Sequence, residues 1–332
     1  MNTTGTLFRV SIFGESHGVN VGAVIDGIPA GVPLCEEDFA SDLDRRRSGA
    51  RGTTPRKESD TPHIVSGLFE GHTTGAPMTV LFDNENTRSG DYSALVSHPR
   101  PGHSDFVAGV KYGGHNDYRG GGHFSGRITL GLVAAGVVAK KMLAACGVTV
   151  SAEVTEIGGE RERRLFPVVI ERALKECDSI GGIVECRASG VPVGWGEPFF
   201  DSVESRLSHL LFSIPAVRGV EFGDGFASAS QRGSVHNDRL SDAAGHTFTN
   251  HAGGINGGIT NGGDILFRIA VKPTSSIATP QMTYNFETGK VEPLVVKGRH
   301  DACIALRVPV IAEAVTAVAL ADLMLVARAY GL

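Results

Sequence analysis

The chain has 332 residues, of which 41% are hydrophobic and 20% are charged, a composition typical of a soluble globular enzyme with one large or two medium domains. Its 44 glycines make up about 13% of the chain, against a usual share of about 7%, but they do not recur at every third position, which excludes a collagen-like fibre. The formal net charge of −5 argues against a general attraction to nucleic acid or to an acidic membrane, so any anion-binding site must be local.

Cysteine usage favours a reducing compartment. The five cysteines are odd in number, widely spaced and free of any C-x-x-C pattern: Cys35, Cys146, Cys177, Cys186 and Cys303. This spacing predicts neither a disulfide framework nor a zinc site, and no H-E-x-x-H pattern occurs, so we predict no metal. The N-terminus lacks the basic and apolar segments of a secretory signal, which favours a cytoplasmic location.

The most apolar run of the chain, residues 308–327, contains Glu313 and Asp322. Charges in the middle of a bilayer are costly. We therefore predict a buried helix of a soluble protein here, and no membrane partner.

The first half of the chain alternates short β-like segments with one charged helix. Strands are predicted where β-branched and aromatic residues run up to glycine or proline, at residues 6–13, 21–28, 63–69 and 77–82. A helix is predicted at 36–47, because Phe39 and Leu43 recur at four-residue spacing and arginines occupy its last turn. The charged segment 48–62 has no apolar periodicity and is predicted to be a loop.

The first half ends with a long predicted helix at 125–146, with Ser125 as its cap and Gly147 as its stop. This helix is apolar nearly all round and carries glycines at small positions, which predicts a central helix packed tightly against others. The later elements are predicted as strand 148–157, helix 168–177, strand 182–188, helix 201–212, strands 217–222 and 264–271, and helix 308–330. The pattern predicts one α+β domain over residues 1–332, with central helices covered by sheets and internal pseudo-symmetry.

The strongest site signal is the stretch from Arg100 to Arg127, RPGHSDFVAGVKYGGHNDYRGGGHFSGR. It holds three arginines, three histidines, two aspartates and a run of three glycines in 28 residues, which is too polar for an ordinary core element. Glycine amides can approach a ligand closely, and arginines beside them suit phosphate or carboxylate. The stretch therefore predicts an anion-binding site.

Residues 14–18, GESHG, match the G-x-S-x-G pattern of serine hydrolases with Ser16 as nucleophile. Only 13 residues precede the motif, and a strand rather than a helix is predicted after it, so the hydrolase context is missing. A glycine-flanked hairpin with solvated side chains is the plainer alternative.

Three other segments are candidates for binding or catalysis. The arginine-rich loop DRRRSGARGTTPRKESD is either a solvated face or an ordered anion loop. KPTSS, at the end of a predicted strand, is either a phosphate-binding turn or a surface turn. In GRHDA, the aspartate is either an ion-pair partner of the arginine or a general base. A clean Rossmann fingerprint and a P-loop are both absent from the sequence.

Taken together, GESHG, RPGHSD, KYGGHNDYRGGG, SGR, VEFGDGF, NHAGGINGG, KPTSS and GRHD resemble the chorismate synthase family, in family order from near residue 8 to the final helix. The resemblance implies a β-α-β sandwich with central helices between antiparallel sheets, assembled as a homotetramer. It implies a lyase that converts 5-enolpyruvylshikimate 3-phosphate to chorismate by anti 1,4-elimination of phosphate, in aromatic amino acid biosynthesis. The reaction requires reduced FMN without net redox change.

The resemblance also implies residue roles. His17 would lie near the departing phosphate, His103 would protonate the reduced flavin, and Asp301 would accept the substrate proton by way of the flavin. Histidine suits such work because its unperturbed pKa lies close to working pH. The substrate's phosphate and two carboxylates would be bound by Arg46, Arg51, Arg100, Arg127 and Arg299. Flavin contacts would come from Ser125, Ala216, Gly257, Lys272, Pro273, Thr274, Ser275, Ser276 and Arg299.

This chain departs from the commoner family pattern at one place. Where many members read RGGGRSSAR, it reads RGGGHFSGR, so His123 and Phe124 replace an arginine and a serine at the flavin. His123 can still donate hydrogen bonds and Phe124 can pack on the ring, and both are kept as predicted cofactor contacts. GRHDA also lacks the common proline after Asp301.

The source of reduced flavin is left open. No additional reductase region is visible, which favours an external flavin reductase, with NAD(P)H acting only indirectly. The competing functions are a serine hydrolase built on Ser16 and a flavin- or phosphate-binding protein without chemistry.

Overall fold

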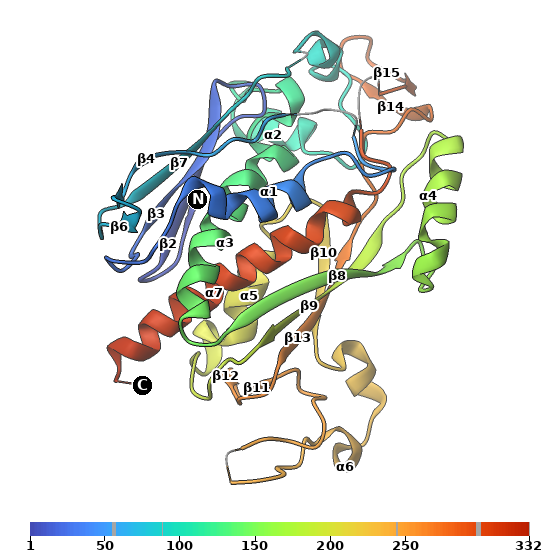
Figure 1. Ribbon diagram of the computed structural model, residues 1–332. Coiled ribbons are helices and arrows are strands. Elements are labelled where there is room, and N and C mark those ends of the chain that lie inside the picture. Colours follow the sequence, from blue (N-terminus) through green and yellow to red (C-terminus); the bar gives the residue numbers. More distant parts are fainter. Residues whose placement is uncertain (55–57, 88, 244, 297–299, 332) are drawn as a thin grey trace.

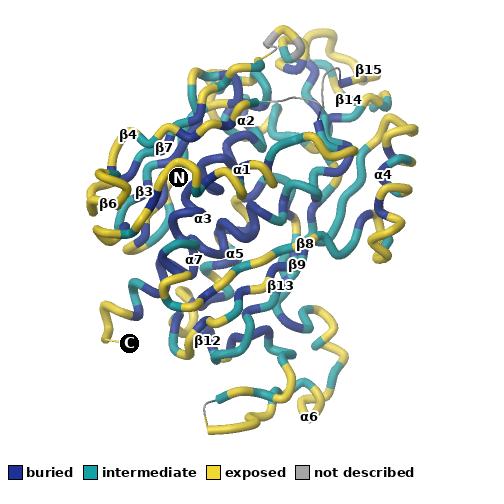
Figure 2. Tube along the Cα trace, in the orientation of Figure 1, coloured by how far each residue is buried: buried dark blue, intermediate teal, exposed yellow. Residues whose placement is uncertain are grey.

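Two long apolar helices form the middle of the molecule and pack against each other (Figure 1). The computed structural model describes residues 1–54, 58–87, 89–243, 245–296 and 300–331. Helix α3 (Thr129–Ala144) and helix α7 (Val308–Ala329) bury most of their side chains (Figure 2). Helices that are apolar all round must be covered on all sides, which confirms the central packing predicted for both.

A five-stranded antiparallel sheet in the order β1-β2-β3-β7-β4 packs on α3. Its strands are β1 (Thr3–Thr4), β2 (Arg9–Gly14), β3 (Asn20–Asp26), β4 (His63–Ser66) and β7 (Met78–Asp83). Strand β2 begins later than the predicted residue 6, because the backbone N–H groups of Thr6, Leu7 and Phe8 donate to the carboxylate of Asp322 on α7 rather than to another strand.

A four-stranded antiparallel sheet in the order β10-β13-β9-β8 packs on α7. Its strands are β8 (Thr149–Ile157), β9 (Gly182–Ser189), β10 (Val217–Phe222) and β13 (Ile265–Val271). Buried and half-buried side chains alternate along β13, as expected for a strand that turns one face to the core. The two helices thus lie between two sheets (Figure 1).

The two halves of the chain repeat one topology. Taken in chain order, the four main strands of each half lie in the sheet order first, second, fourth, third: β2-β3-β7-β4 and β8-β9-β13-β10. Each half places a helix after its second strand, α1 (Ala40–Arg46) or α5 (Val203–Leu211), and a central helix after its fourth. A two-stranded hairpin lies between the third and fourth strands of both halves, β5 (Leu68–Phe69) with β6 (His72–Thr73), and β11 (Ile255–Asn256) with β12 (Ile259–Thr260). The predicted α+β sandwich with internal pseudo-symmetry is confirmed.

Several short elements complete the fold. The helices are α2 (Asp105–Lys111), α4 (Phe166–Lys175) and α6 (Gly233–His236), and a further hairpin consists of β14 (Gln281–Asn285) and β15 (Lys290–Leu294). The 3-10 turns are η1 (Glu36–Phe39), η2 (Ser89–Leu95), η3 (Arg119–Phe124), η4 (Gly126–Ile128), η5 (Arg163–Leu165), η6 (Phe199–Asp201), η7 (Gly225–Ser230) and η8 (Ile304–Arg307). Helix α2 and the β14–β15 hairpin were not predicted, because their exposed side chains give no strong apolar period.

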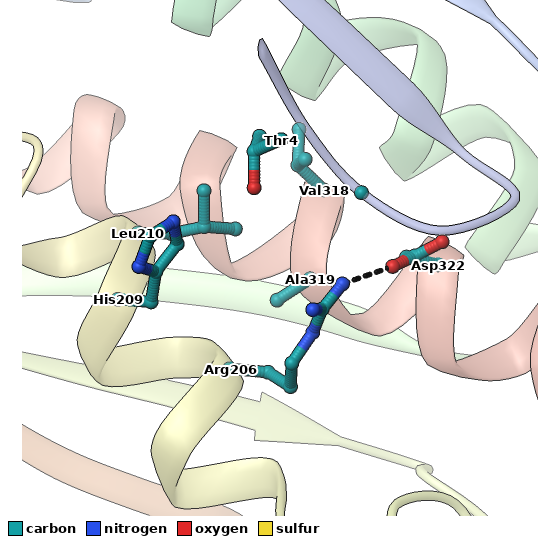
Figure 3. Close-up of a pocket in the computed structure, with 8 residues that line it drawn as sticks. Thr4, Arg206, His209, Leu210, Val318, Ala319 and Asp322 are labelled. Atoms are coloured by element: carbon teal, nitrogen blue, oxygen red, sulfur yellow. Dashed lines mark hydrogen bonds and ion pairs between the residues drawn. The ribbon is translucent and has the colours of Figure 1, made fainter. Parts of the chain in front are cut away.

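The two acidic residues of α7, Glu313 and Asp322, are neutralised inside the protein. Glu313 receives two hydrogen bonds from Arg45, at 2.6 and 2.7 Å, and one from Lys140 at 2.8 Å. Burial raises the pKa of Glu313, but these cations outweigh burial and lower it below its ordinary value. Asp322 pairs with Arg206 at 2.5 Å beside a cavity of about 10 Å³, the space of one water molecule (Figure 3).

The segment Ile304–Ala329 is long and apolar enough to cross a membrane, but 89% of its most apolar window is buried inside the protein. The sheet and the neighbouring helices cover it. The prediction of a buried core helix is confirmed.

Two glycines of α3 permit the close packing of the centre. A Cβ atom at Gly136 would lie 2.3 Å from the Cβ of Ala314 on α7, and one at Gly131 would lie 2.6 Å from the carbonyl oxygen of Gly22 on β3. Neither neighbour can yield without a shift of backbone.

We expect Gly136→Ala to lower the free energy of unfolding by about 1–3 kcal/mol, because overpacking forces the two central helices apart. Urea unfolding measures this change. Gly109→Ala on α2 is the matched control, since nothing lies within 4 Å of a Cβ at Gly109, and alanine should leave stability unchanged or slightly higher there. Equal stability of both variants would contradict the packing argument.

Candidate functional site

The three glycines Gly120, Gly121 and Gly122 form a turn that lies against two of the predicted site histidines, His17 and His103. Their φ angles of 61°, 83° and 54° lie in the left-handed region that favours glycine. A Cβ atom at Gly120 would lie 2.6 Å from the His17 ring, and one at Gly121 would lie 3.7 Å from the His103 ring. The glycine turn therefore brings together two imidazoles that are 86 residues apart in sequence (103 − 17 = 86).

The GESHG loop joins β2 to β3 and is fixed by hydrogen bonds on both sides. The Ser16 amide donates to the carbonyl oxygen of Gly122 at 3.1 Å. The side-chain amide of Asn84 donates to the carbonyl oxygens of Glu15 and Gly18, at 3.0 and 2.8 Å. Ser16 is fully buried in a strand-to-strand connection, so the exposed serine of a hydrolase elbow is not formed.

The carboxylate of Asp105 contacts both His103 and Arg100. Its carboxylate lies 2.6 Å from Nδ1 of His103 and accepts hydrogen bonds of 2.7 Å from both Nε and Nη2 of Arg100. Burial raises the pKa of Asp105, but the hydrogen bonds from Arg100 and His103 outweigh burial and hold it well below its usual range. Nη1 of Arg100 donates to Oγ of Ser276 at 2.8 Å. The charge of Arg100 is thus matched within the protein.

The KPTSS turn follows β13 and closes against the RPGHSD loop. Nζ of Lys272 donates to the carbonyl oxygen of Gly102 at 3.0 Å and to Oγ of Ser275 at 2.6 Å. The backbone N–H of Lys272 donates to the carbonyl oxygen of Ala216 at 2.9 Å. Burial and the nearby Arg218 lower the pKa of Lys272. The KPTSS turn is therefore in direct contact with both Gly102 and Ala216.

Two predicted arginines share one buried carboxylate. Asp60 accepts hydrogen bonds from Nη1 of Arg46 at 3.3 Å and from Nη1 of Arg127 at 2.8 Å. The Nη2 group of Arg46 also donates to the carbonyl oxygen of Gly126 at 3.0 Å. Burial, and then the charge of Arg307, lower the pKa of Arg46 to about 9, so it remains protonated at neutral pH. The side chains of Asp60, Arg46 and Arg127 are at least 94% buried.

Asp301 lies on the same side of the molecule as this arginine pair. Its carboxylate accepts a hydrogen bond of 2.9 Å from the backbone N–H of Thr54 and one of 3.4 Å from Arg307. Arg307 in turn donates from Nε to the carbonyl oxygen of Arg46 at 2.9 Å. A chain of hydrogen bonds therefore links Asp301 to Arg46, Asp60 and Arg127.

His123 and Phe124, the two residues that depart from the commoner family pattern, have different surroundings. Nδ1 of His123 lies 2.7 Å from the carbonyl oxygen of Gly14, and Nε2 lies 3.2 Å from Oδ1 of Asn2. Both ring nitrogens of His123 thus have partners within the chain. Phe124 is 38% exposed, with its ring centre 6.3 Å from that of Tyr112.

Two predicted residues, Arg51 and Gly257, are not brought to this cluster. Arg51 is 74% exposed and pairs with Glu171 at 2.5 Å. Gly257 lies in the β11–β12 turn, at the opposite end of β13 from the KPTSS turn (Figure 1); the seven residues of β13 span about 20 Å. Arg299 lies outside the described residues.

The KPTSS turn carries groups that fit the phosphate of a cofactor such as FMN. Oγ1 of Thr274, in the middle of the KPTSS turn, is buried and has no hydrogen-bond partner among the residues with described positions. A Cβ atom at Gly121 would lie close to both His103 and Ser125, and Oγ of Ser275 in the KPTSS turn donates to the carbonyl oxygen of Gly102, the residue before His103. Backbone amides, hydroxyls and a lysine are the groups that bind phosphate.

Sequence reasoning missed four residues that organise the site: Asp60, Asn84, Asp105 and Arg307. Asp105 belongs to the RPGHSD motif, and its place two residues after His103 was a signal of a histidine–carboxylate pair. Asp60 and Asn84 gave no such signal, since their arginine partners lie 14 to 67 residues away in the sequence. Arg307 lies six residues after Asp301, but its second partner is the backbone of Arg46, 261 residues away.

Loss of the shared carboxylate should destabilise the fold. Asp60→Asn leaves two buried guanidinium groups without their counter-charge, and we expect a loss of about 3 kcal/mol in the free energy of unfolding. Urea unfolding compares it with Asp264→Asn, which removes a half-exposed pair with Arg187 and should cost less than about 1 kcal/mol. Similar losses in both variants would show that Asp60 has no special role.

Comparison with known proteins gives one consistent result. A family model described as chorismate synthase matches residues 8–325. A chorismate synthase of Chitinophaga pinensis is 62% identical over 98% of this chain and 97% of its own length, and one of Porphyromonas gingivalis is 45% identical over 99% and 96%. A crystal structure of a chorismate synthase superimposes with a TM-score of 0.74 at 27% identity, covering 97% of this chain and 92% of the other.

Proposed function

Because the chain belongs to the chorismate synthase family, we propose that it converts 5-enolpyruvylshikimate 3-phosphate to chorismate and phosphate by anti 1,4-elimination with bound reduced FMN. The observation that carries the proposal is the contact of one glycine turn with both His17 and His103. Two histidines in contact with one glycine turn can serve two different proton transfers, which the elimination requires.

The proposed substrate carries a phosphate and two carboxylates, and five arginines are proposed to bind them: Arg46, Arg51, Arg100, Arg127 and Arg299. The buried pair of Arg46 and Arg127 shares only one carboxylate, Asp60. This pair therefore has one positive charge in excess, which supports anion binding. Arg100 is balanced by Asp105, which makes it the weakest of the five assignments.

The flavin is proposed to bind at the KPTSS turn, Lys272 to Ser276, with Ser125, Ala216, His123, Phe124 and Arg299. When bound, reduced FMN supplies an electron-rich ring that assists loss of the phosphate, and the overall reaction leaves its oxidation state unchanged. The Thr274 hydroxyl, which has no hydrogen-bond partner among the described residues, is available to hold a phosphate group.

The proton transfers are assigned to three side chains. His17 is 92% buried, its ring held edge-on by Tyr92 with centres 5.4 Å apart, and it is proposed to protonate the departing phosphate. His103 is proposed to take up and release a proton through Nε2, on the side of Gly121. Asp301 is proposed to accept the proton that leaves the substrate ring, and its bonds to Thr54 and Arg307 keep the carboxylate fixed.

Anaerobic turnover tests the function. The wild-type enzyme with chemically reduced FMN should release phosphate from 5-enolpyruvylshikimate 3-phosphate, and His103→Ala and Asp301→Ala should lower kcat by about 10²–10⁴-fold. Asp301→Ala should keep its affinity for FMN. No phosphate release by the wild-type enzyme contradicts the lyase, and full turnover by Asp301→Ala contradicts the proton assignment.

The same assay separates the alternatives. Ester hydrolysis abolished by Ser16→Ala would favour a hydrolase, and FMN binding without turnover would favour a binding protein. NAD(P)H in place of the chemical reductant should give no phosphate until a flavin reductase is added, because we propose that flavin is reduced externally.

A homotetramer is proposed, in which the predicted contact of Gly257 with a flavin would come from another subunit. The hairpin that carries it packs on the segment around η6, where the N–H of Val203 donates to the carbonyl oxygen of Gly258 at 2.9 Å. On this segment Phe199 and Phe200 are 83% and 92% exposed, and Phe199 has a left-handed φ of 67°. Large apolar side chains exposed together favour burial against a partner.

We expect Phe200→Glu to weaken both assembly and FMN binding, because a charge cannot be buried in an apolar interface without cost. Analytical ultracentrifugation and flavin titration measure the two effects. Phe226→Glu, a second exposed phenylalanine at 85%, is the control. Tetramers of Phe200→Glu with full FMN affinity would contradict the role of this surface.

We also propose that residues 1–332 form one domain located in the cytoplasm. One core cluster that includes both sheets and both central helices supports a single domain. We therefore expect one transition in the urea unfolding experiments above.

All five cysteines are free, as expected in a reducing compartment. Recovery of the protein in the secreted or membrane fraction would contradict the proposed cytoplasmic location.

A further inference from the structure

We infer that Asp105 is a positioning residue that fixes the tautomer and orientation of His103: Nδ1 keeps its hydrogen toward Asp105, and Nε2, beside the glycine turn, is the atom that takes up and releases a proton. The inference rests on the proposed role of His103 and extends it to a residue with no assigned part in the reaction.

The first support is the geometry around the carboxylate. Oδ1 of Asp105 lies 2.6 Å from Nδ1 of His103, and Oδ2 accepts from the backbone N–H of Arg100 at 3.1 Å and from its Nε at 2.7 Å. The side chain of Asp105 is 90% buried and that of Arg100 is 95% buried. Asp105 cannot rotate away without leaving a buried guanidinium unpaired, which is costly.

The second support is the assignment of hydrogens. Asp105 is ionised at neutral pH and can only accept, so a contact of 2.6 Å requires the hydrogen on Nδ1 of His103. Arg100 Nη2 lies 3.0 Å from the same nitrogen, but arginine can only donate and therefore cannot bond to a protonated Nδ1. Nε2 is left to take up and release a proton. It lies 3.8 Å from where a Cβ of Gly121 would be.

The third support is the connection to the proposed cofactor turn. Arg100 bonds to Asp105 through Nε and Nη2 and to Ser276 of KPTSS through Nη1. One ionic unit therefore fixes both the imidazole and the turn. The carboxylate acts on His103 directly and needs no contact of its own with a ligand.

Nitrogen-15 NMR of histidine-labelled protein tests the tautomer without any ligand. In the wild-type protein at neutral pH, the His103 ring should carry its hydrogen on Nδ1. In Asp105→Ala, Nη2 of Arg100 at 3.0 Å and Oγ of Ser104 at 3.5 Å are left beside Nδ1, and both can donate to it, so the hydrogen should move to Nε2. His246, whose Nδ1 lies 2.7 Å from Oδ2 of Asp242 in an exposed loop, is the internal control and should not change.

A double-mutant cycle measures the effect on catalysis. Asp105→Ala should lower kcat by about 10–10³-fold in the wild-type background and by less than about threefold in the His103→Ala background, because it acts through His103. Asp105→Glu, which restores a carboxylate, should recover part of the loss. A structural role alone would give equal losses in both backgrounds.

The outcomes separate this inference from the proposed function. A wild-type His103 with its hydrogen on Nε2, or equal losses in both backgrounds, overturns the inference even if turnover is confirmed. Absence of wild-type turnover overturns the proposed function, and the wild-type spectrum then still decides the tautomer. The spectrum also decides it if Asp105→Ala does not fold.

Discussion

The contact between α3 and α7 is the constraint on which the rest of the structure depends. The two helices approach so closely at Gly136 and Ala314 that no side chain fits between them. Each is covered on its outer side by one sheet. Because both helices begin at the site, their spacing fixes the distance between the segments that precede them, which carry Ser125 and Arg127 in one half and Asp301 and Arg307 in the other. Helix N-termini also favour bound anions.

Buried carboxylates hold the cations of this protein in fixed positions. Asp60 bonds to Arg46 and Arg127 of the site. Asp105 contacts Arg100 and His103. Glu313 bonds to Arg45 and Lys140. A buried guanidinium without a partner is unstable, so each pair restricts where an arginine can lie. An anion that enters the site meets cations already oriented, and the entropy of ordering them is lost on folding rather than on binding.

The two halves share one topology but carry different candidate site residues. In the first half, the connection between the first two strands is the tight GESHG loop, which carries His17 to the glycine turn. In the second half, the equivalent connection contains helix α4 and lies at the edge of the molecule (Figure 1). The second half contributes the KPTSS turn and Asp301 instead. The two halves thus supply different groups to one side of a symmetric core.

The sequence by itself determined the central helices, most strands and the segments that carry chemistry, because apolar period, glycine stops and local motifs are properties of neighbouring residues. Family resemblance also predicted roles for His17, His103 and the KPTSS turn. Only the tertiary structure decided which of these groups meet. It brought Gly120 against His17 and Asp60 between Arg46 and Arg127, and it left Gly257 at the far end of β13. Contacts between residues distant in the chain depend on the packing of two helices and two sheets, and no local pattern encodes that packing.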